Sequence, residues 1–600
     1  LWRASERAAA NAARATASAA GGDDLDQAVA QLRRGDYASA SLTLDRAEVR
    51  IGGPDGPGPL RARLAAARWD AAVAARLRVL QSEATTLYFD ERASADRMPG
   101  TFRAAFRDAG LGGPGDDPAA VARRVRASDV RDLIVAALDE WTMRTGDDAE
   151  IRWAWAVARA ADPDPTGWRE VARSMPGRYD ARVVADLADR ASVATQPPAL
   201  LSALALRLND SGADPIPLLI RAQRVRPADV PLNTYLVHLL QVRRRYAEAM
   251  RYAQAAVTAA PDLPVLRALL ARQVERCGRV DEALDLLREA AAQFPESWVV
   301  RQALGNTFQR AGNDESALVA LDEAVRLGAP ADGRVDLIAG CALAHLGRHA
   351  EALDRFDRAV ARGRPAGAMA GDVRRSLLAL GRAGEACERW RAALAVDPPD
   401  HAAWEGYAEL CLYAGDEAQY RRACRRLLDR FGTATDPSVC ERTGRACLLL
   451  PPADVGDLRR ATALIDRALA APNPPAPYYR DYYAVAKALA DYRAGRYVEV
   501  LAVVDGTGPP TRVLGPMPLL LAAMSHHRLG RPAPALAALR EAALAYDWSP
   551  VESAGPERCM YHVLRREAER LIIPELQAFL DGTYQPRSAD ERVALTAACR

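Results

Sequence analysis

The stretch that decides the fold lies between Val230 and Pro330, where three segments repeat in register: residues 244–261 (RRYAEAMRYAQAAVTAAP), 278–295 (GRVDEALDLLREAAAQFP) and 312–329 (GNDESALVALDEAVRLGA). Each segment begins 34 residues after the one before it. Small residues keep the same place in all three: Ala249, Ala283 and Ala317 form one set, and Ala256, Ala290 and Ala324 another. Small side chains at fixed positions let neighbouring helices cross closely, so this stretch predicts a stack of helix pairs.

The spacing also identifies the kind of repeat. Pro261 and Pro295 close two of the units in the same frame. A 34-residue period with small residues at the helix crossing and a closing proline is typical of the tetratricopeptide repeat. We therefore expect an all-α fold, a right-handed α-α superhelix (solenoid) of antiparallel helix pairs without a β-sheet. One pair cannot bury its own apolar face, so such an array is stable only as a stack.

The repeat pattern is regular in some parts of the chain and irregular in others, and these differences predict the boundaries between its parts. Gly21-Gly22 predicts the end of a first helix. Pro217 predicts the start of a second helix in its unit, because proline is tolerated in the first helical turn but not in the interior. The expected parts are an N-terminal connector helix at 1–22, a first repeat at 23–51, irregular helical repeats at 52–200, regular tetratricopeptide repeats at 201–432, C-terminal helical repeats with a capping helix at 433–580, and a polar, loosely held tail at 581–600.

Composition narrows the classes of partner. The 80 basic and 78 acidic residues nearly cancel, and the charges are interspersed, so we expect neither nucleic acid nor an anionic membrane surface as a partner. Half of the residues are apolar and only 6% aromatic, which favours cores of Ala, Leu and Val between closely packed helices. No run of 18 apolar residues is present, so no membrane span is expected within these 600 residues.

The nine cysteines do not form a recognisable framework. None belongs to a C-x-x-C pair, so neither a zinc site nor a disulfide scaffold is expected. Cys411 and Cys424 fall at core positions of a helical unit, where a free cysteine acts as a small hydrophobe. We expect reduced, buried thiols, no metal site and no cofactor.

Catalytic motifs are absent from the sequence. A protein kinase domain needs a Gly-rich loop, a strand lysine and a metal-binding D-F-G segment, yet Lys487 is the only lysine and follows no such loop. The sequence contains no phosphate-binding G-x-x-x-x-G-K-[ST], no H-E-x-x-H and no G-x-S-x-G. We expect this chain not to be an enzyme, and no catalytic residue is assigned.

One alternative reading concerns an aromatic cluster formed by Trp141, Trp153, Trp155 and Trp168. Helix-spaced indoles usually fill the gaps between helices, which makes them core residues. They could instead line the pocket of a helical enzyme. That reading requires a catalytic pair of side chains, which the sequence does not show.

A stack of helix pairs offers a concave groove lined by the first helix of each pair, where peptides or partner helices bind. In the frame of the best three units, seven polar residues are expected to face it: Thr234, His238, Arg272, Arg276, Gln302, Asn306 and Gln309. Asn306 can pair with a peptide backbone, and Arg272 and Arg276 suit acidic side chains or a carboxylate. The sequence thus predicts a scaffold that binds protein or peptide partners. The other interpretation is that these seven residues are solvated and meet no ligand.

A more specific resemblance lies mostly in the C-terminal third. It is carried by residues 404–412 (WEGYAELCL), 441–451 (ERTGRACLLLP), 513–518 (VLGPMP), 527–531 (HRLGR), 562–569 (HVLRREAE), 584–587 (YQPR) and 590–595 (DERVAL), and more loosely by 181–189 (ARVVADLAD). These segments resemble planctomycete-type serine/threonine protein kinases with C-terminal tetratricopeptide repeats. The motifs are structural, and no kinase active-site position maps onto this chain.

The resemblance implies that the chain is the substrate-recruiting or regulatory C-terminal region of a bacterial signalling kinase. In that family a transmembrane helix often separates the kinase from the repeats, which fits Leu1-Trp2-Arg3 as the exit of an upstream membrane anchor. The implied localisation is cytoplasmic or membrane-tethered through that upstream segment. A free-standing repeat scaffold is the alternative, and an array that docks back on its own kinase is a third.

Overall fold

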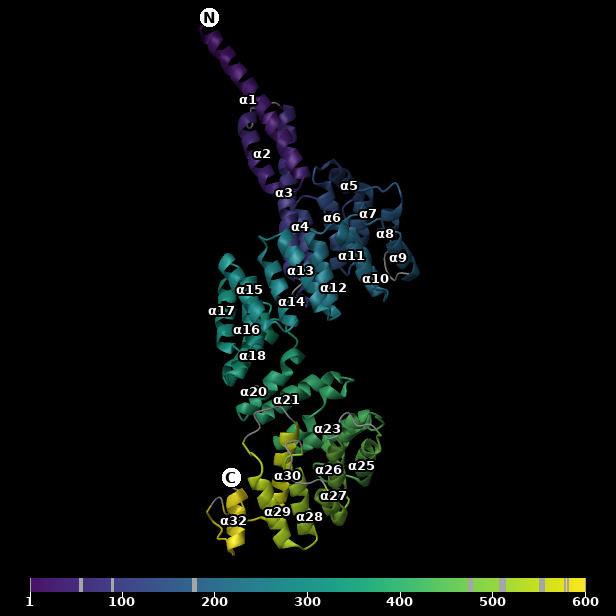
Figure 1. Ribbon diagram of the computed structural model, residues 1–600, viewed down its shortest axis with the longest axis vertical. Coiled ribbons are helices and arrows are strands. Elements are labelled where there is room, and N and C mark those ends of the chain that lie inside the picture. The colour runs from purple at the N-terminus through teal and green to yellow at the C-terminus, as the bar shows by residue number, and fades with distance from the viewer. Residues whose placement is uncertain are drawn as a thin grey trace. The chain divides into compact units, whose positions relative to one another are not determined.

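The computed structural model describes residues 2–52, 58–87, 91–174, 181–472, 479–506, 514–549, 556–576, 579 and 582–598. Within these ranges the chain forms helices and one isolated bridge between Pro114 and Asp116, and it contains no β-strand. The predicted all-α class of stacked helix pairs is confirmed (Figure 1). The chain divides into two compact units, residues 1–330 and residues 331–600, which are described here one at a time.

The N-terminal unit consists of successive helices that pack mainly on their neighbours in sequence. They are α1 (Trp2–Arg33), α2 (Tyr37–Ile51), α3 (Gly58–Leu87), α4 (Glu91–Asp108), α5 (Pro118–Ala127), α6 (Arg131–Arg144), α7 (Asp148–Ala161), α8 (Trp168–Ala172), α9 (Ala181–Asp189), α10 (Pro198–Asp210), α11 (Ile216–Val225), α12 (Val230–Val242), α13 (Tyr246–Ala259), α14 (Pro264–Arg276), α15 (Val280–Gln293), α16 (Trp298–Arg310) and α17 (Asp314–Arg326). Pro217 lies in the first turn of α11, as predicted.

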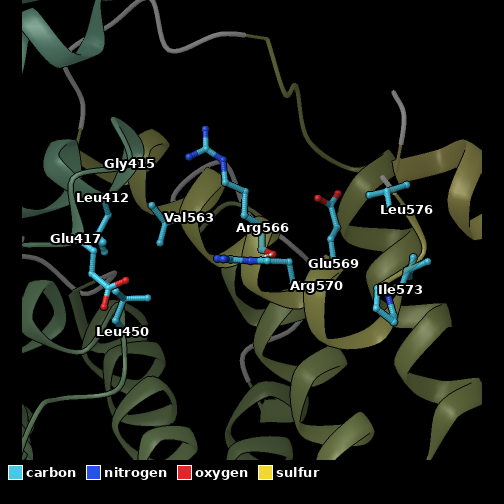
Figure 2. Close-up of a pocket in the computed structure, with 11 residues that line it drawn as sticks. Leu412, Gly415, Glu417, Leu450, Val563, Arg566, Glu569, Arg570, Ile573 and Leu576 are labelled. Atoms are coloured by element: carbon cyan, nitrogen blue, oxygen red, sulfur yellow. Dashed lines mark hydrogen bonds between the residues drawn. The ribbon is translucent and has the colours of Figure 1, made fainter. Parts of the chain in front are cut away.

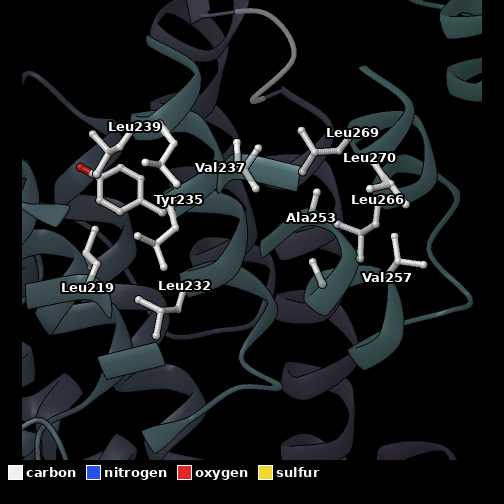
Figure 3. Close-up of a cluster of buried hydrophobic side chains, with 14 of the residues drawn as sticks. Leu219, Leu232, Tyr235, Val237, Leu239, Ala253, Val257, Leu266, Leu269 and Leu270 are labelled. Atoms are coloured by element: carbon white, nitrogen blue, oxygen red, sulfur yellow. The ribbon is translucent and has the colours of Figure 1, made fainter. Parts of the chain in front are cut away.

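The repeated alanines form the closely packed core of this unit. Ala249, Ala253 and Ala256 of α13 are fully buried, and their spacing of four and three residues places them on one helix face. Figure 3 shows Ala253 beside leucines such as Leu266, which belong to the next helix, α14. An apolar stripe of this kind is buried only when the next helix is present, so the repeats stabilise each other.

The turns between paired helices keep the 34-residue frame as well. Arg244, Gly278 and Gly312 occupy equivalent places, with left-handed φ values of 57°, 82° and 76°. In each case the following backbone N–H bonds back to the preceding helix, as Arg245 N does to the Leu240 carbonyl at 2.8 Å. Two of the three turns use glycine, which tolerates this conformation, and one uses arginine, which does not.

We expect Arg244→Gly to stabilise the chain by about 1 kcal/mol, because an L side chain in the left-handed region costs roughly that much. Urea unfolding of the full chain, followed by circular dichroism, measures the change. The control is Arg251→Gly in the exposed face of helix α13, which should destabilise by about 0.5–1 kcal/mol. If both variants were destabilised equally, the turn at residue 244 would not be strained.

The N-terminal helix is longer than the sequence suggested. The expectation that Gly21-Gly22 ends it is wrong, because α1 continues to Arg33. A Cβ atom on Gly21 would lie 2.8 Å from Cγ1 of Ile51, at the end of α2. The glycine therefore permits close packing of α1 on α2, and the two helices form the first pair.

The C-terminal unit continues the succession of helices. They are α18 (Arg334–His345), α19 (His349–Ala361), α20 (Ala370–Ala379), α21 (Ala383–Ala393), α22 (Tyr407–Tyr413), α23 (Glu417–Phe431), α24 (Pro437–Cys447), α25 (Val455–Leu469), α26 (Tyr479–Arg493), α27 (Tyr497–Gly506), α28 (Met517–Arg528), α29 (Pro532–Leu544), α30 (Pro556–Ile572) and α32 (Ala589–Ala598). The expectation of a loosely held tail is wrong over residues 589–598, since α32 packs on α29 and buries Leu595 completely.

Small residues allow close helix crossings in both units, as the sequence pattern predicted. A Cβ on Gly340 of α18 would lie 2.5 Å from the ring of Phe356 on α19. A Cβ on Gly305 of α16 would lie 2.7 Å from Leu321 on α17. In each pair the glycine leaves the space that the larger side chain fills.

The cysteine prediction is confirmed for the two residues it named. Cys411 and Cys424 are buried, and the cysteines in the described ranges are free thiols. Cys411 Sγ lies 2.9 Å from Sγ of Cys387, so two thiols meet between α21 and α22. Over the part of the chain that the structure describes, no helix has both the length and the apolarity to cross a bilayer.

Candidate functional site

The seven residues predicted to bind a partner lie on α12, α14 and α16, each the first helix of its pair. We call α12, α14 and α16 the N-terminal first-helix row. The structure places Thr234 and His238 on α12, Arg272 and Arg276 on α14, and Gln302, Asn306 and Gln309 on α16.

Polar side chains hold this row together from helix to helix. The Gln273 amide of α14 donates to the Gln241 side-chain oxygen of α12 at 3.0 Å. Glu275 of α14 accepts hydrogen bonds from Thr307 at 3.2 Å and from Arg310 at 2.7 Å, both on α16. Sequence reasoning missed these residues, although Gln273, Glu275, Thr307 and Arg310 directly adjoin predicted ones in the sequence. They fix the spacing of the helices that carry the candidate site.

Solvent exposure divides the seven predicted residues into one that is buried and six that are half-buried or exposed. Thr234 is only 3% exposed, and its hydroxyl donates to the Val230 and Pro231 carbonyls of its own helix. It does not present its side chain at the surface, so its assignment to the binding face is corrected. Arg276 is exposed, and the other five are half-buried. Asn306 and Gln302 are four residues apart and so share one face of α16.

The C-terminal unit has a comparable row made of α22, α24, α26 and α28, which we call the C-terminal first-helix row. Consecutive helices of this row contact one another. The helix α30 packs against both ends of the row, on α22 and on α28. Sequence reasoning expected a capping helix here, which explains contacts with the last pair but not with α22.

An ion pair joins α30 to the middle of the row. The Arg493 guanidinium at the end of α26 donates to both carboxylate oxygens of Glu567, at 2.5 and 2.7 Å. The same guanidinium donates to the Leu448 and Leu449 carbonyls, just after α24. The side chain of Arg493 is 2% exposed and that of Glu567 is 20% exposed. A bidentate ion pair that is this well buried from solvent fixes the geometry of both side chains.

Two further contacts connect α30 to the row, one near the N-terminal end of α30 and one near the middle of α30. Arg445 Nη1 of α24 lies 3.1 Å from Sδ of Met560. Arg566 Nη1 donates to the Tyr413 carbonyl at the end of α22, at 3.0 Å. Together with the Arg493 pair, these contacts reach α22, α24 and α26. The helix α30 therefore crosses the first helices of successive pairs, as a bound helical ligand would.

Buried charge lies beneath this contact. Arg445 and Glu441 form a buried ion pair within α24 at 2.5 Å. Glu409 of α22 is 3% exposed, and its pKa is raised to about 7, chiefly because burial disfavours the carboxylate. Arg445 acts in the opposite direction and lowers that pKa, whereas Glu557 raises it.

His562 of α30 sits between aromatic rings. Its imidazole lies edge-on to Tyr413 and to Trp548, with ring centroids 5.5 and 5.4 Å away. Burial lowers the pKa of His562 to about 4, and the neighbouring Arg566 cation lowers it further in the same direction. The ring is therefore neutral at pH 7 and packs as an aromatic side chain.

A cavity of about 540 Å³ opens beside the C-terminal half of α30. Figure 2 shows Leu412 and Leu450 on one side of it, with Val563, Arg566 and Arg570 of α30 on the other. Its lining combines apolar side chains with two arginines, Arg566 and Arg570, and two glutamates, Glu417 and Glu569, so the charges in it balance. No periodic signal in the sequence points to this cavity.

The tryptophan cluster is part of the core of the N-terminal unit. Trp141 is fully buried, lies tilted against Phe106 with ring centroids 5.1 Å apart, and donates to Glu150 at 3.0 Å. Trp153 packs edge-on against Trp141, and its indole N–H is bonded to the Asp116 carbonyl. The core interpretation is confirmed for these indoles, and the reading of a Trp-lined catalytic pocket is wrong for them.

Comparisons with known proteins identify the repeat. Residues 264–307, which span α14, α15 and part of α16, match the family model of the tetratricopeptide repeat. No protein among the curated ones matches this chain.

Three solved structures are similar at low identity. A tetratricopeptide repeat protein from Parabacteroides merdae is 14% identical, with 44% of this chain and 98% of that chain covered and a TM-score of 0.29. YrrB, a TPR protein with an unusual peptide-binding site, is 16% identical over 31% and 94% of the two chains, with a TM-score of 0.23. The APC/C hetero-tetramer Cut9-Hcn1 is 13% identical over 90% and 94%, with a TM-score of 0.34. All three TM-scores lie below 0.5, so the fold assignment rests on the helix pairs and the family model.

Proposed function

We propose that this chain, with its tetratricopeptide repeat region, is a scaffold that binds peptide or protein partners along its first-helix rows. In the N-terminal row the proposed contact residues are Arg272, Arg276, Gln302, Asn306 and Gln309, with His238 at the edge.

One observation carries this proposal. In the C-terminal unit the first-helix row already contacts a helix, α30, through Arg445, Arg493 and the Tyr413 carbonyl. First helices of this chain are therefore able to bind a helical segment with directed polar contacts. The N-terminal row has the same kind of helices and carries half-buried polar groups.

The side chains of the N-terminal row suggest the chemistry of the partner. Arg272 and Arg276 are one helical turn apart on α14 and favour acidic side chains or a terminal carboxylate. Asn306 and Gln302 on α16 carry amides that can donate to and accept from a peptide backbone. We expect an extended or helical segment that carries acidic residues.

The test is a double variant, Arg272→Glu with Asn306→Asp, assayed by quantitative capture on the immobilised full chain. Charge reversal at the centre of the row should weaken acidic partners at least about tenfold, because like charges oppose each other across a contact. The matched control is Arg251→Glu with Gln254→Glu, which makes the same change of charge on the exposed face of α13. If both variants captured partners as well as the wild-type chain does, the face that carries Arg272 and Asn306 would not be the binding site.

A finer proposal concerns the parent protein. The motifs at 404–412, 441–451 and 562–569 resemble the C-terminal repeats of planctomycete-type serine/threonine kinases. We propose that the scaffold recruits substrates or regulates such a kinase, tethered to a membrane through an upstream segment. The parent reading frame tests this. A kinase domain with its Gly-rich loop and H-R-D segment encoded upstream of Leu1 would support the proposal, and a frame without one would favour a free-standing scaffold.

A further inference from the structure

The helix α30 differs from the other helices of the C-terminal unit in what it contacts. A helix of the stack packs mainly on its partner and on the adjacent pair, as α24 does on α25. By contrast, α30 reaches residues far away in sequence, with separations of 74 for Arg493–Glu567, 115 for Arg445–Met560 and 153 for Tyr413–Arg566. It is laid across the stack and is not one half of a repeat.

The contacts of α30 with α24 and α26 follow one helical face, whereas His562 and Arg566 contact Tyr413 of α22 from another side of the helix. Met560, Leu564 and Glu567 are spaced four and three residues apart, and Leu564 is fully buried. Met560 meets Arg445, and Glu567 meets Arg493. This face carries apolar residues and one carboxylate, and two arginines of the row contact it. An amphipathic helix bound in a groove has the same pattern.

The contact combines buried apolar side chains of α30, such as Met560 and Leu564, with charged side chains of the row. Pairs within the stack meet through fully buried small and aliphatic side chains, such as Ala461 and Leu464 of α25. The row beneath α30 instead contains the charged side chains of Glu409, Glu441 and Arg445. Charged groups beside buried apolar side chains are also found at interfaces between separable parts of a chain.

We propose that the C-terminal first-helix row is a helix-binding surface that α30 occupies in cis, and that a partner helix with the same apolar face and carboxylate displaces it. This inference rests on the proposed function, because it gives the second row of the chain the same role. A tethered helix competes at an effective concentration on the order of millimolar, so α30 sets a threshold that the partner has to exceed.

The experiment uses the full chain and a labelled synthetic peptide of residues 556–572 as the probe. The chain carries Glu567→Arg, which places a cation beside Arg493 and weakens α30 in cis while leaving the row unchanged. Fluorescence anisotropy should show saturable binding of the wild-type peptide to this variant, at least about tenfold tighter than to the wild-type chain. A peptide with Glu567→Arg should bind the variant at least about tenfold more weakly than the wild-type peptide does.

Hydrogen exchange on the same variant shows whether the row survives. We expect the amides of α30 to lose protection while those of α24 and α26 keep it, and the control Glu541→Arg on the exposed face of α29 to change neither. Loss of protection in α24 and α26 together with α30 would mean that α30 is an integral part of the core and would overturn the proposal. So would equal binding of both peptides, or no binding of either.

A second copy of this chain is the competing occupant. Exchange of α30 between copies would produce wild-type dimers in light scattering at tens of micromolar, and that result would also overturn displacement by a separate partner. The capture assay with Arg272→Glu and Asn306→Asp tests the N-terminal row without involving α30, so failure of the displacement proposal can be told apart from failure of the proposed function.

Discussion

Replacing Arg173 by methionine is expected to destabilise the N-terminal unit by about 3–5 kcal/mol, because a buried carboxylate then loses its cation. Arg173 follows α8 and donates to both oxygens of Asp139 on α6, at 2.9 and 2.8 Å. Neither of these two side chains is exposed to solvent. A third bond from Arg173 reaches Asp162 at 3.1 Å, after α7, so one guanidinium ties three helices together.

Urea unfolding of the full chain measures this effect. Burial raises the pKa of the Asp139 carboxyl, so the variant is forced either to protonate that group or to leave it charged and unpaired. The control is Arg190→Met, which breaks an ion pair with Asp186 whose side chains are 67% and 62% exposed and should cost less than about 1 kcal/mol. Equal losses in the two variants would mean that the buried pair does not organise this region.

Replacing Glu409 by glutamine is expected to give the largest stabilisation, and only at high pH. The pKa of Glu409 is raised from 4.5 to about 7 in the folded chain, mainly by burial. The folded state therefore binds the proton more tightly than the unfolded state. Its contribution to stability is fully present below pH 4.5 and is lost as the pH rises through 7.

Glutamine imitates the protonated acid and removes this dependence. The stability difference between variant and wild type should grow from about 1 kcal/mol at pH 5 to on the order of 3 kcal/mol at pH 9, at about 1.4 kcal/mol per unit of pKa shift. Urea midpoints between pH 5 and pH 9 measure it, and Glu499→Gln on the exposed face of α27 is the control. A difference that does not change with pH would show that Glu409 does not titrate in this range.

The regular part of the fold could be predicted because its signal is local and repeated. Ala249, Ala283 and Ala317 are fully buried, as their 34-residue spacing predicted. Pro217 lies in a first helical turn for the steric reason that predicted it. Gly21 misled the prediction because a glycine inside a helix can serve close packing as well as a helix end.

The site could be predicted only in part. The periodic frame placed its seven residues on the first helices, but it did not reveal that the Thr234 hydroxyl bonds to its own helix. The position of α30 could not be predicted, since it depends on single contacts such as Arg493–Glu567 between segments 74 residues apart. Contacts of that kind carry no period, and only the folded chain brings them together.

Photo-crosslinking tests the central claim, that the first-helix rows are the binding surface, most directly. A benzophenone amino acid is placed at Asn306 on α16 and, in a second chain, at Val319 on α17, which is 70% exposed. We predict partner adducts from position 306 that acidic peptides compete away, and none from position 319. Adducts from position 319 alone, or equal adducts from both positions, would contradict the account.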